Sequence, residues 1–303
     1  MTEIRLYLGA HKTATTHLQG IMLANRAVLA EAGVRLSAPQ DVRREWLPLY
    51  FKAVRALIDT GEIPDDVSAP LRAWMPATGD WILTEENIIG VPIELLNQPG
   101  IYPHAGKRLA ALRALFPEAR LRLFFSVRSY DGFWRSMYSE IVRNRGFLPF
   151  EEFWKPKAFA KRSWVDTVAS FAAQLPQDDI VLWKFEDFAA VQDMALAQIT
   201  GQADTAPLVA AYKAEPTRPS LSQKALQVLG DIVPVIGREQ GLKLTERIND
   251  HYAVAAGHAP FQPFDADQVK EMRAAYARDL ATIRERFPTV HWLEPAAAAQ
   301  KAG

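Results

Sequence analysis

The chain has 303 residues, and its 35 Lys and Arg balance 35 Asp and Glu, so the formal net charge at pH 7 is zero. With 49% hydrophobic and 23% charged residues, its composition is that of a globular protein, which excludes a disordered or fibrous chain. The neutral balance argues against a dedicated nucleic-acid binder. The absence of Cys excludes disulfides, thiolate nucleophiles and Cys-ligated metal sites, and it fits a reducing compartment.

Residues 1–8 carry charges among their apolar residues and do not form the hydrophobic run of a secretion signal. No stretch approaches the roughly 18 apolar residues needed to span a bilayer. We therefore expect a cytoplasmic protein with no membrane span and no nucleic-acid partner. Composition leaves the oligomeric state open.

Four short runs of β-favouring residues predict strands over residues 4–8, 81–84, 121–127 and 180–183. A helix is expected after the first strand, with Thr15 or Thr16 as its N-cap. The spacing of apolar residues predicts further helices over 105–116, 132–143, 164–175 and 188–200.

Strands that alternate with helices predict an α/β fold, in which a central, mainly parallel sheet is flanked by helices. The last third of the chain changes character. It predicts helices over 221–236 and 266–287, separated by a loop at 257–265. We expect one domain over residues 1–295 that includes these C-terminal helical additions, and a flexible Ala-rich tail at 296–303.

The loop after the first strand, from Gly9 to His17, reads Gly-Ala-His-Lys-Thr-Ala-Thr-Thr-His. Backbone N–H groups at a helix start, a lysine ammonium and threonine hydroxyls can all gather there around an anion. The order is not that of a Walker A loop, where Lys follows a second Gly. An ordinary capped helix with a solvated lysine is the alternative, and the position directly after the first strand counts against it.

The string from His11 to Thr16 resembles the 5′-phosphosulfate-binding loop of sulfotransferases that use 3′-phosphoadenosine 5′-phosphosulfate (PAPS). The usual form of that loop is K-[ST]-G-T-[ST], so Ala14 stands where the family has Gly and fits if its φ stays negative. The resemblance implies a three-layer, P-loop-like fold with Lys12 on the leaving side of the reaction. It also implies the residues that bind the 5′-phosphosulfate group: Lys12, Thr13, Ala14, Thr15 and Thr16.

A second part of the resemblance follows the strand at 121–127. Family members carry an Arg at the end of such a strand and a Ser eight residues later, and both hold the 3′-phosphate; Arg128 and Ser136 have this spacing. Arginine offers several planar donors to phosphate, and serine adds a hydroxyl. The resemblance further implies that His17, unless it lies on the helix surface, stacks on the adenine. A late loop containing Arg218 would close over the nucleotide, and Phe185 replaces a Tyr of the family.

The catalytic base is expected at the end of the strand over 81–84. The run from Thr84 to Ile88 resembles the S-S-E-[NS]-[LI] element of bacterial and carbohydrate sulfotransferases. That alignment implies that Glu86 is the base, and an adjacent carboxylate, Glu85, would raise the pKa of one of the pair. His11 is a rival base and His104 a weaker one. The alternative is an acidic pair that serves a helix N-terminus.

Together these motifs imply a sulfotransferase that moves the sulfuryl group of PAPS to a hydroxyl or amine of an acceptor. The acceptor is unidentified, and a carbohydrate is one candidate. The other product is 3′-phosphoadenosine 5′-phosphate, and the scheme requires no metal. The alternatives are a P-loop kinase of small molecules, or a non-catalytic nucleotide-binding protein with the same fold. A kinase would need a Walker A lysine and a strand-end Asp for Mg²⁺.

Overall fold

The computed structural model describes residues 2–98, 100–155, 161–213 and 220–296. At its centre lies a six-stranded sheet in which every neighbouring pair of strands is parallel, in the order β2-β3-β1-β4-β5-β6. The predicted α/β fold with a parallel sheet and flanking helices is therefore confirmed. The strands are β1 (Glu3–Tyr7), β2 (Val34–Ser37), β3 (Asp80–Leu83), β4 (Arg120–Val127), β5 (Ile180–Lys184) and β6 (His291–Leu293).

The four strands expected from the sequence are present, and the two edge strands, β2 and β6, were not predicted. β6 has three residues, and β2, which reads Val-Arg-Leu-Ser, lacks the apolar run that identifies the equally short β3. The four inner strands are buried on both faces, so their sequences read as nearly continuous apolar runs.

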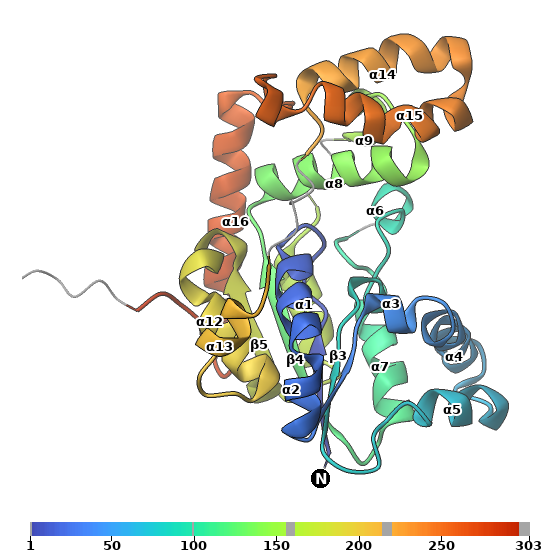
Figure 1. Ribbon diagram of the computed structural model, residues 1–303, viewed down its shortest axis with the longest axis vertical. Helices are drawn as coiled ribbons and strands as arrows, with labels where there is room; N and C mark the ends of the chain where they lie inside the picture. The colour runs from blue at the N-terminus through green and yellow to red at the C-terminus, as the bar shows by residue number, and fades with distance from the viewer. Residues whose placement is uncertain (1, 99, 156–160, 214–219, 297–303) are drawn as a thin grey trace, which may run out of the picture.

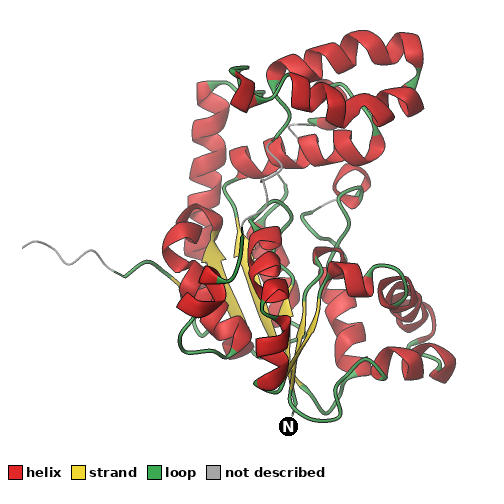
Figure 2. Cartoon of the chain, viewed as in Figure 1, coloured by secondary structure: helices red, strands yellow, loops and turns green. Residues whose placement is uncertain are grey.

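Helices cover both faces of the sheet, as Figures 1 and 2 show. On the near side in Figure 1 lie α1 (Thr15–Ala24), α2 (Arg26–Glu31), α12 (Phe188–Thr200) and α13 (Ala206–Ala210). The opposite face packs against α4 (Trp46–Thr60), α5 (Asp65–Arg72), α7 (Ala105–Leu115) and α11 (Trp164–Ala172). Each face thus has its own apolar core.

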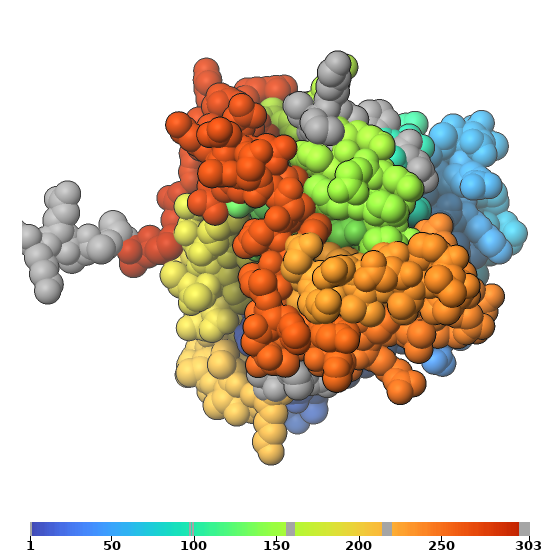
Figure 3. Space-filling view, turned by 90° about the horizontal axis from the view of Figure 1, so that it is seen from above, coloured from blue at the N-terminus to red at the C-terminus, as the bar shows by residue number. Residues whose placement is uncertain are grey.

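A further group of helices lies at and beyond the carboxyl ends of the strands, and the last of them runs back beside the sheet toward β6 (Figure 1). It consists of α8 (Tyr130–Arg145), α9 (Phe150–Phe153), α14 (Gln223–Ile236), α15 (Arg238–His251) and α16 (Ala266–Arg286). Seen from that end in Figure 3, α14 and α15 cover much of the surface beside α8. The predicted C-terminal helical additions are confirmed, and the predicted loop at 257–265 contains neither helix nor strand.

Short elements complete the described chain. They are α3 (Pro39–Val42), α6 (Glu94–Asn97), η1 (Glu86–Ile88), η2 (Gln177–Asp179), η3 (Phe185–Asp187) and η4 (Val254–Ala256). None of the described helices is long and apolar enough to cross a membrane. Arg218 and the tail from residue 297 onward lie outside the described residues.

The start of α1 differs from the prediction. Its N-cap is Ala14, which makes no side-chain capping bond, so the expected Thr15 or Thr16 cap is wrong. A left-handed backbone at Ala14 turns the chain into the helix instead. The helical run also breaks at Asn25, whose side-chain amide donates to the carbonyls of Ile21 and Leu208, both at 2.8 Å, and this separates α1 from α2.

Candidate active site

The predicted site residues gather at the carboxyl ends of the central strands. Strand β1 lies between β3 and β4, and the chain crosses from one side of β1 to the other as it passes from β3 to β4. In open α/β sheets, ligands bind in the crevice at such a switch point, outside the carboxyl ends of the strands. The topology therefore puts the loop between β1 and α1 (residues 8–14, the β1–α1 loop) where a ligand is expected.

The β1–α1 loop is built from left-handed backbone turns. Gly9, Lys12 and Ala14 have φ values of 52°, 65° and 61°. A Cβ on Gly9 would lie 2.2 Å from Thr15 Cγ2, so a side chain does not fit there. Turns of this kind can direct successive backbone N–H groups at an anion. The first turn of α1 adds its own free N–H groups and contains no acidic residue that would neutralise the helix dipole.

The conformation of Ala14 corrects one expectation. A negative φ was expected to let alanine replace the family's glycine, but the residue lies in the left-handed region at φ 61°. For an L-residue with a Cβ, that region costs roughly 1–2 kcal/mol. The loop thus keeps a glycine-type backbone although it carries an alanine. Among the described residues, the non-glycine residues with positive φ are Lys12, Ala14 and Tyr102, and all three belong to this site.

The three threonines of the loop differ in their contacts. The buried Thr13 hydroxyl donates to the Ala10 carbonyl at 2.5 Å and braces the loop internally. The buried Thr15 hydroxyl donates to Glu86 Oε1 at 2.5 Å and joins the loop to the end of β3. Thr16 is exposed. Of the three hydroxyls, that of Thr16 is the one available to a ligand without breaking a hydrogen bond of the loop.

Lys12 reaches across to α8. Its Nζ lies 3.4 Å from Glu140 Oε2. Burial lowers the pKa of Lys12, and the Glu140 charge opposes that shift without cancelling it. Burial would raise the pKa of Glu140, but Lys12 and Asn144 outweigh it and the pKa is lowered. The pair is therefore ionised near neutral pH, and an anion in the loop would compete with Glu140 for the ammonium.

Arg128 follows β4 and meets the β1–α1 loop from the other side. Its Nη1 donates to the Lys12 carbonyl oxygen at 2.5 Å, and its guanidinium lies 4.3 Å from the centre of the Phe185 ring. Burial lowers the pKa of Arg128 to about 10, and the charge of Glu186 only partly offsets this. Within the described parts of the chain, Arg128 forms no ion pair with a carboxylate.

Ser136 lies on the side of α8 that faces Arg128. A Cβ on Gly132 would be 3.0 Å from Arg128 Nε, so the absence of a side chain there lets the guanidinium lie against the helix. Residues four apart share one helix face, and Gly132, Ser136 and Glu140 follow this spacing. One face of α8 therefore runs from Arg128 to Lys12, with the buried Ser136 between them.

Glu85 and Glu86 are buried at the end of β3 and share the guanidinium of Arg43. Glu85 accepts from Arg43 Nε at 2.6 Å and Nη2 at 3.2 Å, and also from the backbone and side-chain amides of Asn87. Arg43 Nη2 lies 3.7 Å from Glu86 Oε2, which has no hydrogen-bond partner among the described residues. Glu85 is thus occupied by hydrogen-bond donors, while Oε2 of Glu86 accepts no hydrogen bond from a described residue and has the longer ion pair with Arg43.

His11 is held by Tyr102. The Tyr102 hydroxyl accepts from the His11 backbone N–H at 2.8 Å and lies 2.8 Å from His11 Nδ1, while Nε2 lies 3.4 Å from Asn87 Oδ1. A neutral imidazole protonated at Nε2 satisfies every contact, because the Tyr102 O–H then donates to Nδ1 and Nε2–H donates to Asn87. Burial lowers the pKa of His11, which favours this neutral form.

His17 lies away from these charges. Its ring meets Phe188 and Tyr212 edge-on, with ring centres 5.9 and 5.5 Å apart, beside the face of the sheet that α12 and α13 cover. An aromatic surface is therefore available next to the β1–α1 loop. The expected contribution of Arg218 lies outside the described residues.

The assembled site combines a loop of left-handed turns at the start of a helix, two cations that follow neighbouring strands, and a buried carboxylate with one oxygen that accepts no hydrogen bond from a described residue. Comparisons with protein-family models, curated proteins and solved structures found no match to this chain. Among the described residues, no group of His, Asp and Glu side chains could hold a metal ion.

Three contributors to the site were missed by the sequence analysis: Arg43, Tyr102 and Glu140. Glu140 could have been found, because it follows Ser136 by four residues on a predicted helix and so shares its face. Arg43 and Tyr102 belong to segments between strands whose path the sequence does not specify. Their role depends on tertiary contacts with Glu85 and His11.

Proposed function

We propose that the chain is a sulfotransferase, which transfers the sulfuryl group of PAPS to a hydroxyl or amine of an acceptor. The observation that carries the proposal is the hydrogen bond between Arg128 and the Lys12 carbonyl, which joins residues 116 apart in the sequence. It puts the Arg128 guanidinium against the backbone of the loop that carries Lys12, and two cations that follow neighbouring strands suit a ligand with two separate anionic groups. PAPS is such a ligand, because it carries a 3′-phosphate and a 5′-phosphosulfate.

The two cations would divide these anionic groups between them. Lys12, the backbone N–H groups of the β1–α1 loop and Thr16 would hold the 5′-phosphosulfate. Arg128 and Ser136 would hold the 3′-phosphate. The fit is supported by the lowered pKa of Arg128, whose charge is left without a carboxylate partner in the described structure. A bound phosphate would supply that partner through charge-assisted hydrogen bonds.

The bound PAPS supplies an activated sulfuryl group with a phosphate as the leaving group. In the reaction the bond between sulfur and the bridging phosphate oxygen breaks, and a bond between sulfur and the acceptor oxygen or nitrogen forms. Lys12, which stays protonated, neutralises the charge that develops on the leaving phosphate. Glu86 takes the acceptor proton on Oε2, the oxygen without a hydrogen-bond partner among the described residues.

Glu86 suits the role of base better than His11. With His11 protonated at Nε2 and accepting from Tyr102 at Nδ1, neither ring nitrogen is free to take a proton. Glu86 has a free oxygen at the same end of β3 and is joined to the β1–α1 loop through Thr15. His11 would instead donate a hydrogen bond from Nε2 and help to keep Asn87 and the loop in place.

One observation favours a second candidate function, a P-loop kinase of small molecules. P-loop NTPases hold Mg²⁺ between a Ser or Thr of the loop and a carboxylate at a strand end. The Thr15 hydroxyl and the Glu86 carboxylate form such a pair, 2.5 Å apart. The loop nevertheless lacks a Walker A lysine. Arg128, which follows β4, also suits a second phosphate group better than a magnesium ion.

The test measures thermal unfolding of the full chain with 3′-phosphoadenosine 5′-phosphate, AMP, or ATP with Mg²⁺. A ligand at about 100 times its Kd stabilises the folded state by about 2.7 kcal/mol. The proposal expects this with the bisphosphate, and a much smaller effect with AMP. If ATP with Mg²⁺ stabilises the chain and the bisphosphate does not, the kinase is favoured instead. If the bisphosphate binds, turnover of PAPS with a panel of sugars, alcohols and amines separates an enzyme from a non-catalytic nucleotide-binding protein.

A further inference from the structure

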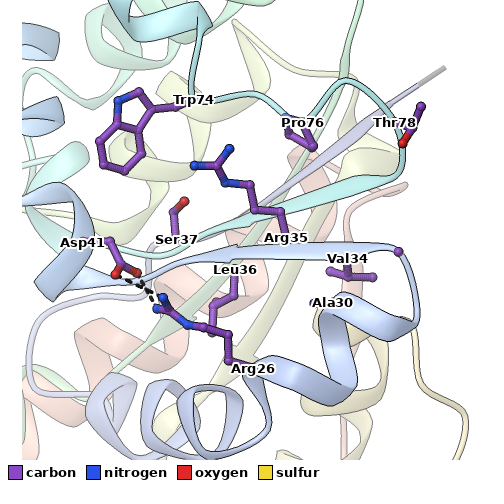
Figure 4. Close-up of a pocket in the computed structure, with 11 residues that line it drawn as sticks. Arg26, Ala30, Val34, Arg35, Leu36, Ser37, Asp41, Trp74, Pro76 and Thr78 are labelled. Atoms are coloured by element: carbon purple, nitrogen blue, oxygen red, sulfur yellow. Dashed lines mark hydrogen bonds and ion pairs between the residues drawn. The ribbon is translucent and has the colours of Figure 1, made fainter.

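The edge strand β2 lines a cavity of about 690 Å³ that is separate from the candidate active site. Its floor is residues 33–37, which are five consecutive residues along the sheet edge. Its walls are Arg26 and Ala30 on one side, and Trp74, Pro76 and Thr78 on the other. Figure 4 shows β2 running between these two walls. We refer to it as the β2 groove.

The backbone of β2 turns unpaired polar groups toward this groove. Gly33 and Ser37 accept from Asp80 and Thr84 at 3.0 and 2.9 Å, so the alternate residues 33, 35 and 37 direct their backbone groups toward β3. Val34 and Leu36 must then direct theirs toward the free edge. No hydrogen bond to these groups is formed by any described residue, and β2 ends the sheet. Such an edge is a template for another strand.

The charges of the groove specify the partner. Arg26 is paired with Asp41, at 2.5 Å, but Arg35 has no ion-pair partner among the described residues. The Arg35 guanidinium lies 5.8 Å from the Trp74 ring centre, on the side of β2 away from Ala30 (Figure 4). The groove therefore carries one uncompensated positive charge beside an aromatic wall.

Self-pairing of two β2 edges is disfavoured by this charge. In an antiparallel pair centred on β2, Val34 would face Leu36 of the second copy, and Arg35 would face Arg35 of that copy. Like charges that lie directly opposite one another destabilise a sheet. A strand with Asp or Glu opposite Arg35 gains an ion pair instead, and its flanking residues lie on the face of Val34, Leu36 and Ala30, where apolar side chains fit.

We propose that the β2 groove binds an extended segment of another protein, which adds a strand to the sheet and has the pattern apolar–acidic–apolar. The backbone groups of Val34 and Leu36 supply the hydrogen bonds, and Arg35 selects the acidic residue. This is strand addition, in which main-chain bonds provide affinity and alternate side chains provide specificity. The proposal does not depend on the reaction that the active site performs.

The experiment uses the full chain and the blocked, fluorescently labelled peptide Ser-Thr-Val-Glu-Val-Thr-Ser. Control peptides carry Lys in place of Glu, or Pro in place of one Val, which removes a backbone donor. We expect the Glu peptide to bind at least tenfold more tightly than either control. In the Arg35→Glu variant the preference should reverse toward the Lys peptide. In a matched variant of an exposed arginine outside the groove, Arg55→Glu, it should not change.

Hydrogen exchange locates the bound peptide. The amides of Val34 and Leu36 should become protected, while that of Arg35, already directed toward β3, should change little. The proposal is overturned if no peptide binds at 1 mM, or if the Glu and Lys peptides bind equally. It is also overturned if the two amides stay unprotected. The proposal would also be overturned if the unmodified chain forms a dimer and the Arg35→Glu variant does not. The occupant of the β2 groove would then be a second copy of the chain.

Discussion

Arg5 and Arg120, near the amino ends of the central strands, differ from Arg128, at the carboxyl ends, in the groups that hold their guanidinium charges. At the amino ends of the strands, Arg5 lies 2.7 Å from Glu3 and 2.5 Å from Asp80, and Arg120 lies 2.6 Å from Asp179. At the carboxyl ends, Arg128 donates to a backbone carbonyl and meets an aromatic ring, with no carboxylate partner among the described residues.

The pKa values of Arg120 and Arg128 differ in the same way. The hydrogen bond and charge of Asp179 raise the pKa of Arg120, whereas burial lowers that of Arg128 to about 10. Strained backbone is also found near the carboxyl ends of the strands. The described non-glycine residues with positive φ all lie there: Lys12, Ala14 and Tyr102. Strain and uncompensated charge persist where the surrounding structure enforces them, and they cluster at functional sites. The unpaired charge of Arg128 and the strained loop beside it are what the proposed anion site at the carboxyl ends would require.

The largest effect is expected from Glu86→Gln, which keeps the shape of the side chain and removes its ability to accept a proton. If Glu86 is the base, turnover of PAPS should fall by about 10²- to 10⁴-fold. Stabilisation by 3′-phosphoadenosine 5′-phosphate should be unchanged, because the ligand is held by other residues. Steady-state kinetics and thermal unfolding measure the two quantities. Full turnover in this variant would shift the role of base to His11.

Arg5→Met tests the amino end of the sheet. It removes the ion-pair partner of Asp80, one of the two arginines paired with Glu3 (the other is Arg120, at 3.5 Å), and a hydrogen bond to the Ile199 carbonyl, while it preserves much of the side-chain volume. We expect a loss of about 3 kcal/mol in the free energy of unfolding, since breaking a largely buried ion-pair network leaves the Asp80 carboxylate without an ion-pair partner among the described residues. Urea denaturation measures it, with Arg55→Met as the control for an exposed arginine. A loss below about 1 kcal/mol would remove the contrast between the two ends.

Arg128→Met makes the same change at the carboxyl end. Without ligand, the free energy of unfolding should stay within about 1 kcal/mol of the original, because no ion pair is broken and one hydrogen bond is lost. The Kd for 3′-phosphoadenosine 5′-phosphate should rise by about 10- to 100-fold, the value of a charge-assisted hydrogen bond. The Kd for AMP should barely change. Equal weakening of both ligands would contradict the assignment of Arg128 to the 3′-phosphate.

The sequence predicted the inner sheet and the loop, since both depend on local signals. Buried parallel strands read as apolar runs, and the string from Lys12 to Thr16 is contiguous. Contacts between distant segments were beyond its reach. Nothing local reveals that Thr15 bonds to Glu86 rather than capping α1, that Glu140 pairs with Lys12, or that Tyr102 holds His11. The edge strand β2 was missed because its four residues include Arg35 and Ser37 and so form no apolar run, unlike the four residues of β3.

Ala14→Gly tests the strain in the β1–α1 loop. Relief of the left-handed conformation should outweigh the greater freedom of glycine in the unfolded chain and stabilise the protein by about 1 kcal/mol. The same change at Ala277, an exposed residue within α16, should destabilise it by about 1 kcal/mol. Urea denaturation of both variants gives the comparison. Destabilisation by Ala14→Gly would mean that Ala14 is not strained.

The smallest effect concerns the pH dependence of stability near His11. Burial lowers the pKa of His11 in the folded state, so between pH 7 and 6 the unfolded chain takes up a proton that the folded chain refuses. The contribution of His11 is therefore complete above its unfolded pKa of about 6.5, and is lost as the pH falls toward the folded value. Relative to His11→Gln, the wild-type chain should lose about 0.5 kcal/mol of stability over that unit of pH. The titration of the other histidines is common to both chains and cancels in this difference in the free energy of unfolding.

A difference in the free energy of unfolding that stays flat, or that grows as the pH falls, would show that His11 is not held neutral. His11 would then carry a charge at the same end of the sheet as Lys12 and Arg128. The hydrogen-bond directions inferred for its contacts with Tyr102 and Asn87 would then be wrong.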